Sequence, residues 1–313
     1  MEWVRELTHS KRSSVHLYRL MHSFVAVKHV DAKRVYLRGE NDEFAEPRVH
    51  RILSKANHPN IVELYGERSL NDGTIELIME YCPEGSLFDV LSAMPNQQFP
   101  TEIARVFFQQ IVAGVAYMHG EGYAHRDLSL ENILVDSNHV CKIADFGDVI
   151  GVDHVCTDRA GKLFYMAPEV YNGEYYIPGE ADIWSLGVML FTMLTGHPLF
   201  FKADESDPNY SILISDGFDA LVQKLGMALP SMEMDIIEQM LEIDPEERIT
   251  IEELITHEYI AQTSRITATP AVRSPSKAIR HQRGYRYHPY DVRTNAAKHK
   301  RLEKFEAIMF NIL

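Results

Sequence analysis

The sequence predicts an α+β protein with two lobes: a small β-rich lobe over residues 1–80 with one main helix, and a larger α-helical lobe over residues 85–260. Short apolar runs of strand length dominate the first part, whereas apolar residues recur at helical spacing in the second. The segment from residue 261 onward has little apolar periodicity, which predicts a basic, partly disordered tail over residues 261–313. A ligand cleft is expected between two lobes of this kind.

Three strands, one helix and a turn are predicted in the first lobe. Residues 15–20 alternate in polarity, which is typical of a half-buried strand, and residues 24–27 and 74–79 form short apolar runs. Apolar residues at helical spacing over residues 44–53 predict a helix between these strands. The Asn-Asp-Gly sequence at residues 71–73 predicts a hairpin turn before the last strand.

Two long helices stand out in the second lobe. Residues 103–118 carry apolar side chains at helical spacing, which predicts one amphipathic helix. Residues 184–194 are apolar on nearly all sides, so this helix is expected to be buried. In the tail, residues 301–313 are expected to form a last amphipathic helix.

The composition favours an intracellular protein, in the cytoplasm or nucleus. Of the 313 residues, 45% are apolar, which allows a sizeable core. The three cysteines form no C-x-x-C pair, so neither a disulfide framework nor a zinc site is expected. The first residues carry charges where a signal peptide needs an apolar run, and the apolar stretches are too short to span a membrane.

The charge distribution bears on the class of partner. Residues 1–260 carry 20 Lys or Arg and 42 Asp or Glu, a net charge of −22, whereas residues 261–313 carry 11 and 3. An acidic body repels nucleic acid, so no nucleic-acid partner is expected. It could favour basic peptide substrates, or it could serve solubility alone.

The clearest chemical signal is H-R-D-L-S-L-E-N at residues 125–132, followed by D-F-G at residues 145–147. Asp127 can orient a hydroxyl group and take its proton, as transfer of a phosphoryl group from ATP requires. Asn132 and Asp145 can supply oxygen ligands to metal ions that bridge phosphates. The combination of these motifs at this spacing is far more specific than any one of them alone.

Together with A-P-E at residues 167–169, these motifs resemble the signature of eukaryotic protein kinases of the Ser/Thr type, over about residues 3–260. The resemblance implies a bilobal protein-kinase fold, ATP and Mg²⁺ as cofactors, and proteins as substrates. It implies that Lys28 contacts the phosphates, that Asp127 is the catalytic carboxylate, and that Asn132 and Asp145 bind the metal.

The resemblance also implies a nucleotide pocket, with the backbone of Glu80 and Cys82 bonding adenine and Met79 behind it. The implied nucleotide-binding residues are Val15, Ala26, Lys28, Met79, Glu80, Cys82, Ser86, Leu134 and Asp145. A column of side chains should link the lobes; its implied members are Leu53, Leu64, His125 and Phe146. Asp182 should hold the catalytic loop, and Arg248 should pair with Glu169.

Residues 8–15 depart from the family pattern, because the loop that covers the phosphates has none of the three family glycines. Glycine lets the backbone approach phosphates closely and adopt a positive φ. Lys11 and Arg12 could place positive charge there instead. We expect weaker or slower nucleotide binding.

The helix glutamate that should pair with Lys28 is also out of place. Counting back from His58, the family position holds Val49, and Glu46 lies one turn earlier on the same face. Glu46 either replaces the missing glutamate or is only a charged first-turn residue stabilised by the helix dipole.

A third departure involves two positions. The family lysine two residues after the catalytic aspartate is Ser129, and the family threonine that this lysine contacts is Lys162. The hydroxyl and the cation have exchanged places, so we hypothesise that Lys162 provides the catalytic ammonium group next to Asp127.

Substrate type and regulation follow from the same resemblance. The catalytic loop lacks the insertions of tyrosine kinases, which favours Ser or Thr acceptors. Arg126 before the catalytic aspartate suggests ordering by phosphorylation, with Thr157 as the site for an upstream kinase; Asp158 could instead supply the charge. The alternative to an active, monomeric kinase is a pseudokinase that serves as a nucleotide-binding or scaffold module.

Overall fold

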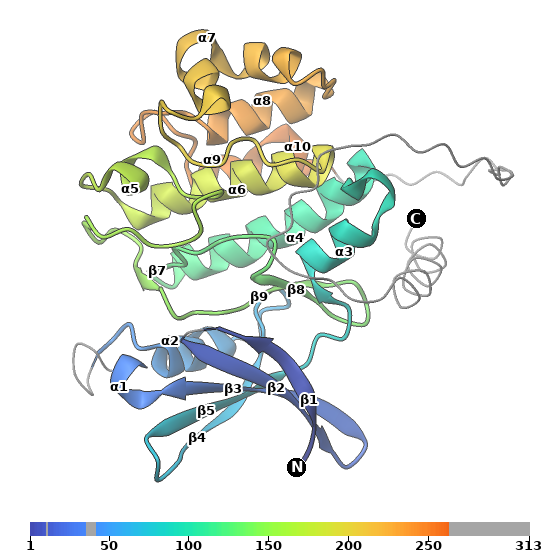
Figure 1. Cartoon of the computed structure of the whole chain (residues 1–313), viewed down its shortest axis with the longest axis vertical. Helices are drawn as coiled ribbons and strands as arrows, with labels where there is room; N and C mark the ends of the chain where they lie inside the picture. The colour runs from blue at the N-terminus through green and yellow to red at the C-terminus, as the bar shows by residue number, and fades with distance from the viewer. Residues whose placement is uncertain (11, 36–41, 263–313) are drawn as a thin grey trace, which may run out of the picture. The chain divides into compact units, whose positions relative to one another are not determined.

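The computed structural model describes residues 1–10, 12–35 and 42–262. A five-stranded sheet is followed by a larger helical part, which confirms the predicted α+β class with two lobes (Figure 1). The tail predicted over residues 261–313, with its last helix, falls almost entirely outside the described residues.

The small lobe is an antiparallel sheet in the order β1-β2-β3-β5-β4. Its strands are β1 (Glu2–His9), β2 (Ser13–Leu20), β3 (Ser23–Asp31), β4 (Leu64–Ser69) and β5 (Thr74–Glu80). The three predicted strands correspond to β2, β3 and β5, and the predicted turn joins β4 to β5. Val15 pairs with Lys28, and Ala26 with Met79. Because paired residues and alternate residues of a strand share a face, these four side chains lie on one side of the sheet.

Two helices accompany the sheet: α1 (Ala32–Val35) and α2 (Glu46–Ser54). Helix α2 is the predicted helix, and it has a proline in its first turn, where the missing N–H costs no hydrogen bond. Its buried face includes Glu46, Val49, His50 and Leu53. The helix therefore turns both a carboxylate and an imidazole toward the interior.

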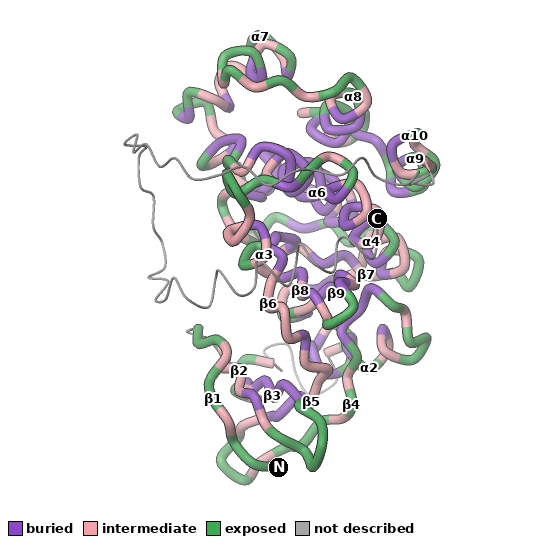
Figure 2. Tube along the Cα trace, turned by 90° about the vertical axis from the view of Figure 1, so that its right-hand side faces the viewer, coloured by how far each residue is buried: buried purple, intermediate pink, exposed green. Residues whose placement is uncertain are grey.

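The large lobe is built around α4 (Thr101–Gly120) and α6 (Pro178–Thr195), which contain the two predicted helices. Helix α6 is buried along almost its whole length (Figure 2). Its Trp184 is completely inaccessible. The remaining helices are α3 (Leu87–Ala93), η1 (Pro95–Gln97), α5 (Pro168–Asn172), α7 (Pro208–Lys224), α8 (Ser231–Met240), α9 (Ile251–Thr256) and α10 (Glu258–Ala261). The buried faces of α4 and α6 form the apolar core on which the loops described next are packed.

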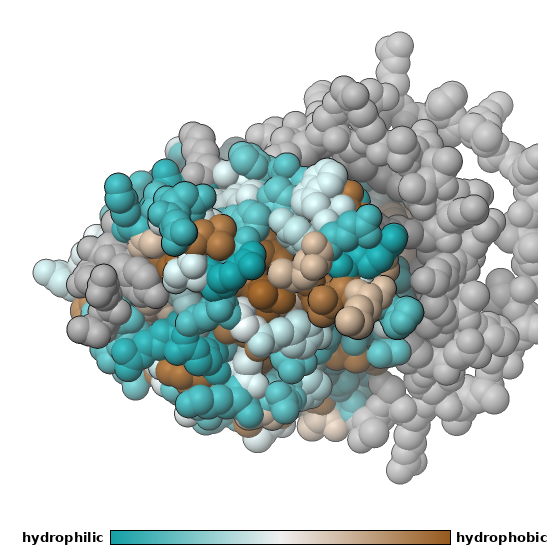
Figure 3. Space-filling model, turned by 90° about the horizontal axis from the view of Figure 1, so that it is seen from below, coloured by the Kyte–Doolittle hydropathy of each residue, from teal (hydrophilic) through white to brown (hydrophobic). Residues whose placement is uncertain are grey.

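Short strands frame these loops: β6 (Gly85–Ser86), β7 (Tyr123–Ala124), β8 (Ile133–Val135), β9 (Cys141–Ile143) and β10 (Ile150–Gly151). The H-R-D segment follows β7, and the D-F-G segment follows β9. Seen from below, the end of the small lobe is mainly hydrophilic, with apolar side chains near the middle of the view (Figure 3). Among the described residues, none of the helices is both long and apolar enough to cross a lipid bilayer.

Candidate active site

The catalytic loop (residues 125–132) is held by one buried carboxylate of α6. The backbone N–H groups of His125 and Arg126 donate to the two oxygens of Asp182 at 2.7 and 2.9 Å. Asp182 is 1% exposed, and Nε2 of His119 lies 3.0 Å from its Oδ2. Arg126 has a φ of 65°, a left-handed conformation that is uncommon outside glycine. The loop thus keeps a strained turn because the most buried helix fixes it.

Asp127 is positioned so that one carboxylate oxygen is left for a ligand. The amide of Asn132 donates to the backbone oxygen of Asp127 at 2.7 Å and to its Oδ2 at 2.8 Å. Oδ1 of Asp127 is buried and has no hydrogen-bond partner in the described structure. A buried carboxylate oxygen without a partner is costly, so it fits the hydroxyl group of an acceptor substrate.

Lys28 of β3 links α2 to the D-F-G segment. Its ammonium group lies 2.5 Å from Glu46 and 2.7 Å from Asp145. Burial alone would lower the pKa of Lys28, but the two carboxylates raise it above its ordinary value. Glu46 therefore takes the place of the missing helix glutamate as the partner of Lys28, and is not merely a charged residue of the first turn. Val49, the position reached by counting, is fully buried instead.

The residues expected to hold a metal ion fit that purpose. Partial loss of hydration would raise the pKa of Asp145, but Lys28 lowers it to about 2, so the carboxylate is anionic. Its side chain is 50% exposed. Both amide hydrogens of Asn132 point to Asp127, which leaves its amide oxygen for other partners. Two oxygen donors without a full protein cage suit Mg²⁺, which keeps water and phosphate ligands.

Apart from Asp145, the residues expected to bind the nucleotide lie on the sheet, on the segment after β5 (residues 81–84) and on β6 and β8. Ala26 and Cys82 are buried, and Met79 and Leu134 are partly buried. The carboxylate of Glu80 pairs with Lys142 at 3.0 Å, and its backbone N–H donates to the backbone oxygen of Glu63 at 2.9 Å. The hydroxyl of Ser86 caps α3 through Asp89, which gives this predicted nucleotide contact a structural role.

The phosphate loop (residues 8–15) closes on itself and on the D-F-G segment. Oγ of Ser10 accepts from the backbone N–H groups of Arg12 and Ser13 at 3.2 and 3.0 Å. The guanidinium group of Arg12 contacts both oxygens of Asp148 at 3.0 and 3.1 Å. Lys11 lies outside the described residues. The backbone N–H groups of Arg12 and Ser13 and the guanidinium group of Arg12 are therefore engaged within the protein.

The column between the lobes includes a residue that sequence reasoning missed. The ring of Phe146 lies 4.7 Å from His50 of α2 and 5.9 Å from His125, measured between centroids. Burial lowers the pKa of His50 to about 4, and Nε2 lies 2.7 Å from the backbone oxygen of Val62. Because Glu46 rather than Val49 faces Lys28, the residue one turn further is His50, which packs on Phe146. Leu53, which was expected in the column, is fully buried.

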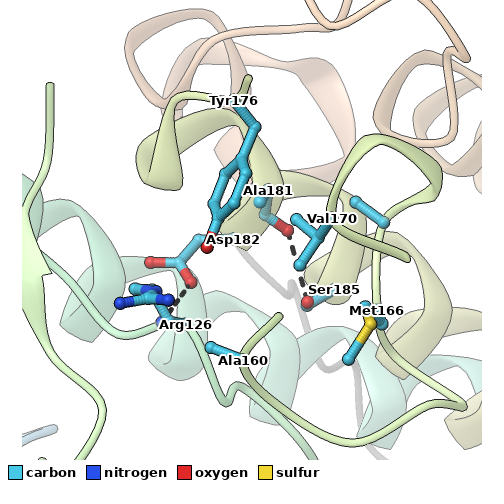
Figure 4. A pocket seen from close by; sticks show the side chains of 9 residues that line it. Arg126, Ala160, Met166, Val170, Tyr176, Ala181, Asp182 and Ser185 are labelled. Carbon is cyan, nitrogen blue, oxygen red and sulfur yellow. Dashed lines mark hydrogen bonds between the residues drawn. The ribbon is translucent and has the colours of Figure 1, made fainter. Parts of the chain in front are cut away.

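The activation segment (residues 145–169) contacts the catalytic loop through a carboxylate. Arg126 donates to Asp158 at 2.6 Å, and the hydroxyl of Tyr176 donates to the backbone oxygen of Asp158 at 2.9 Å. Arg126, Tyr176 and Asp182 line a small pocket behind the segment (Figure 4). Thr157 is exposed. The sequence left Thr157 and Asp158 open as partners of Arg126, and the structure has Asp158 in that position.

Lys162 forms an ion pair with Asp127, and a second, separate ion pair lies at the end of the activation segment. The ammonium group of Lys162 lies 3.5 Å from Oδ2 of Asp127 and donates to Oγ of Ser129 at 2.6 Å. Arg248 and Glu169 form a buried pair at 2.8 and 3.2 Å, as the resemblance implied. Gly161, which the sequence did not single out, packs directly against the catalytic loop.

Comparisons with known proteins agree with this arrangement. The family model described as "Protein kinase domain" matches residues 11–260. The chain is 37% identical over 212 residues to maternal embryonic leucine zipper kinase of Xenopus laevis, which covers 66% of this chain and 31% of that protein.

Two further relatives come from rice and human. Serine/threonine protein kinase OSK3 of Oryza sativa subsp. indica is 37% identical over 237 residues, which are 75% of this chain and 44% of that protein. NUAK family SNF1-like kinase 1 of Homo sapiens is 36% identical over 238 residues, 75% of this chain and 34% of that protein. The chain spans less than half the length of these three relatives.

Proposed function

The chain belongs to the protein kinase family, and we propose that it is an ATP- and Mg²⁺-dependent kinase that phosphorylates Ser and Thr hydroxyl groups of proteins. One observation carries the proposal. The pair Lys28–Asp145 and the pair Asn132–Asp127 are adjacent, because the N–H of Ala144 donates to the backbone oxygen of Asn132 at 2.9 Å. A nucleotide-holding cation, two metal ligands and a proton acceptor therefore converge.

The roles follow from this geometry. Asp127 accepts the proton of the acceptor hydroxyl at Oδ1, its oxygen without a partner. The hydroxyl oxygen forms a bond to the γ-phosphorus, the bond from that phosphorus to the bridging oxygen breaks, and ADP leaves with the electron pair. Asp145 and Asn132 would hold Mg²⁺, which neutralises charge on the phosphates. Lys28, fixed by Glu46, binds the nucleotide phosphates.

The choice of acceptor is supported by two lines of reasoning. The catalytic loop lacks the sequence that tyrosine kinases carry there, and OSK3 is named a serine/threonine kinase. The net charge of −22 over residues 1–260 favours basic proteins as acceptors.

We also propose that the chain acts as a monomer inside the cell. Thr157 stays a candidate site for an upstream kinase.

Phosphate transfer to a basic protein tests the proposal. The purified chain is incubated with Mg²⁺ and radiolabelled ATP, and with mixed histones as acceptor. Asp127→Asn should lower transfer by about 10²- to 10⁴-fold, because it removes the proton acceptor. Asp145→Asn should in addition lose the stabilisation by Mg²⁺–ATP in a thermal-shift assay.

The matched control is Asp219→Asn, which changes an exposed acid on α7 far from these contacts. It should retain wild-type transfer, and acid hydrolysis of the product should release phosphoserine or phosphothreonine. Absence of transfer to histones and to the chain itself would favour the pseudokinase alternative.

A further inference from the structure

The activation segment presses against the catalytic loop at Gly161. This glycine has a φ of 87°, and a Cβ atom there would lie 2.6 Å from the backbone oxygen of Arg126 and 3.6 Å from Cα of Asp127. Such a contact is too short for any other residue, so the close approach depends on glycine. It brings the next residue, Lys162, to the edge of the catalytic carboxylate.

Lys162 is held there by two groups of the catalytic loop. Its ammonium group donates to Oγ of Ser129 at 2.6 Å and lies 3.5 Å from Oδ2 of Asp127. Ser129 is fully buried, so its hydroxyl is a fixed anchor, whereas the Lys162 side chain is 36% exposed. A cation that is anchored on one side and accessible on the other can contact a ligand without rearranging.

We propose that Lys162 is a catalytic residue whose ammonium group stabilises the transferring phosphoryl group, a role it performs from the activation segment. In the reaction, charge on the phosphoryl oxygens must be balanced while the bond to ADP breaks and the bond to the acceptor oxygen forms. Among the described residues, Lys162 is the only lysine or arginine in an ion pair with Asp127. It therefore stands beside the group that takes the acceptor's proton.

This placement ties catalysis to the order of the activation segment. Lys162 lies four residues after Asp158, which pairs with Arg126 at 2.6 Å. Displacement of the segment would remove the cation together with the packing of Gly161. The inference rests on the proposed function, and it adds that one segment carries both the ordering contact and a reacting group.

Substitution of Lys162 is compared with that of a matched lysine. Lys162→Met should lower kcat for histone phosphorylation by about 10²- to 10³-fold and leave KM for ATP within about threefold. The control Lys202→Met removes a lysine whose side chain is 35% exposed and which pairs with Asp204 instead. It should have wild-type kcat. Turnover of Lys162→Met within about threefold of wild type would overturn the inference while the proposed function stands.

Moving the cation from residue 162 back to residue 129 should restore activity. Lys162→Thr should be as inactive as Lys162→Met, whereas Ser129→Lys together with Lys162→Thr returns the cation to the catalytic loop. The double variant should recover at least about tenfold in kcat over Lys162→Thr. If the double variant folds, by its melting temperature, and recovers nothing, the proposed exchange is wrong.

A binding measurement separates this role from a structural one. Aluminium fluoride with Mg²⁺–ADP imitates the transferring phosphoryl group, and thermal shift reports its binding. Lys162→Met should bind Mg²⁺–ADP like the wild type but lose the additional stabilisation by aluminium fluoride. Equal stabilisation in both proteins would overturn the inference. If wild-type protein transfers no phosphate to any acceptor, the proposed function fails and this inference with it.

Discussion

The phosphate loop of the small lobe and the catalytic loop of the large lobe both depart from the family sequence, but only the departure in the catalytic loop is compensated. In the phosphate loop the three glycines are absent, and Ser10 accepts hydrogen bonds from the loop's own N–H groups. In the catalytic loop a serine replaces the lysine, yet Lys162 brings an ammonium group to the same carboxylate.

The difference concerns which state of the reaction each region serves. Contacts of the phosphate loop hold ATP before it reacts, whereas charges around Asp127 are needed while the phosphoryl group moves. The chain has kept a cation beside Asp127, supplied by Lys162, but lacks the glycines of the phosphate loop. We therefore expect a high KM for ATP together with an ordinary kcat.

Of four further variants that probe this comparison, the largest effect is expected from Gly161→Ala, which would separate the activation segment from the catalytic loop. The added Cβ would lie 2.6 Å from the backbone oxygen of Arg126. A shift of about 1 Å in Lys162 should lower kcat about 100-fold. Gly226→Ala is the control, because it has a φ of 67° and no atom within 4 Å. Equal losses in both variants would show that backbone strain alone is responsible.

A smaller loss is expected from Asp158→Ala, which leaves the Arg126 side chain without its carboxylate. The pair lies at 2.6 Å, and Arg126 is only 6% exposed, so the segment should lose order and kcat should fall about tenfold. Thr157→Ala, at the exposed neighbour, should change kcat less than twofold. Phosphatase treatment of the wild type should also leave kcat unchanged. A large loss in Thr157→Ala would instead support activation by phosphorylation at Thr157.

Glycines returned to the phosphate loop should act on binding rather than on turnover. Thr8→Gly, Ser10→Gly and Ser13→Gly together free the backbone N–H groups that Ser10 now occupies. One hydrogen bond to a charged phosphate is worth at least about 1.5 kcal/mol, so KM for ATP should fall about tenfold. Steady-state kinetics should give kcat within about twofold of wild type. A rise in kcat without a change in KM would contradict the comparison.

The smallest effect at neutral pH is expected for His50, which lies between the two regions. Its pKa is lowered from 6.5 to about 4, so the unfolded chain binds a proton more readily than the folded chain. Stability from this group is complete above about pH 6.5 and is lost as the pH falls toward 4, on the order of 3 kcal/mol in total. Urea unfolding of His50→Leu should show a weaker loss over this range, with exposed His22→Leu as control. Identical pH profiles for wild type and His50→Leu would show that protonation of His50 does not contribute to the loss of stability.

Sequence patterns were sufficient for the elements with strong periodicity. Helix α6 is apolar on all sides and is buried, and β2, β3 and β5 follow their alternation or apolar runs. Strand β1 was not singled out, because its side chains are mostly exposed and its apolar pattern is weak. The short strands that frame the loops depend on tertiary pairing, which local patterns do not encode.

The candidate site divides in the same manner. Lys28, Asp127, Asn132 and Asp145 lie in motifs, so the sequence was enough to name them. The length of the connection after α2 is not readable from the sequence, so the choice between Glu46 and Val49 needed coordinates, and His50 was missed for the same reason. The sequence could not say whether Arg126 faces Thr157 or Asp158, because the directions of adjacent side chains in a loop depend on backbone angles that the sequence does not reveal.

The pairing of Arg126 with Asp158 has a consequence for how long the protein stays switched on. A phosphate on a side chain can be added and hydrolysed, so its presence records a recent signal. An aspartate is encoded in the gene and persists until the polypeptide is degraded. A kinase ordered in this way would have no off-state reached by dephosphorylation, and its output would follow its abundance and the supply of nucleotide and acceptor.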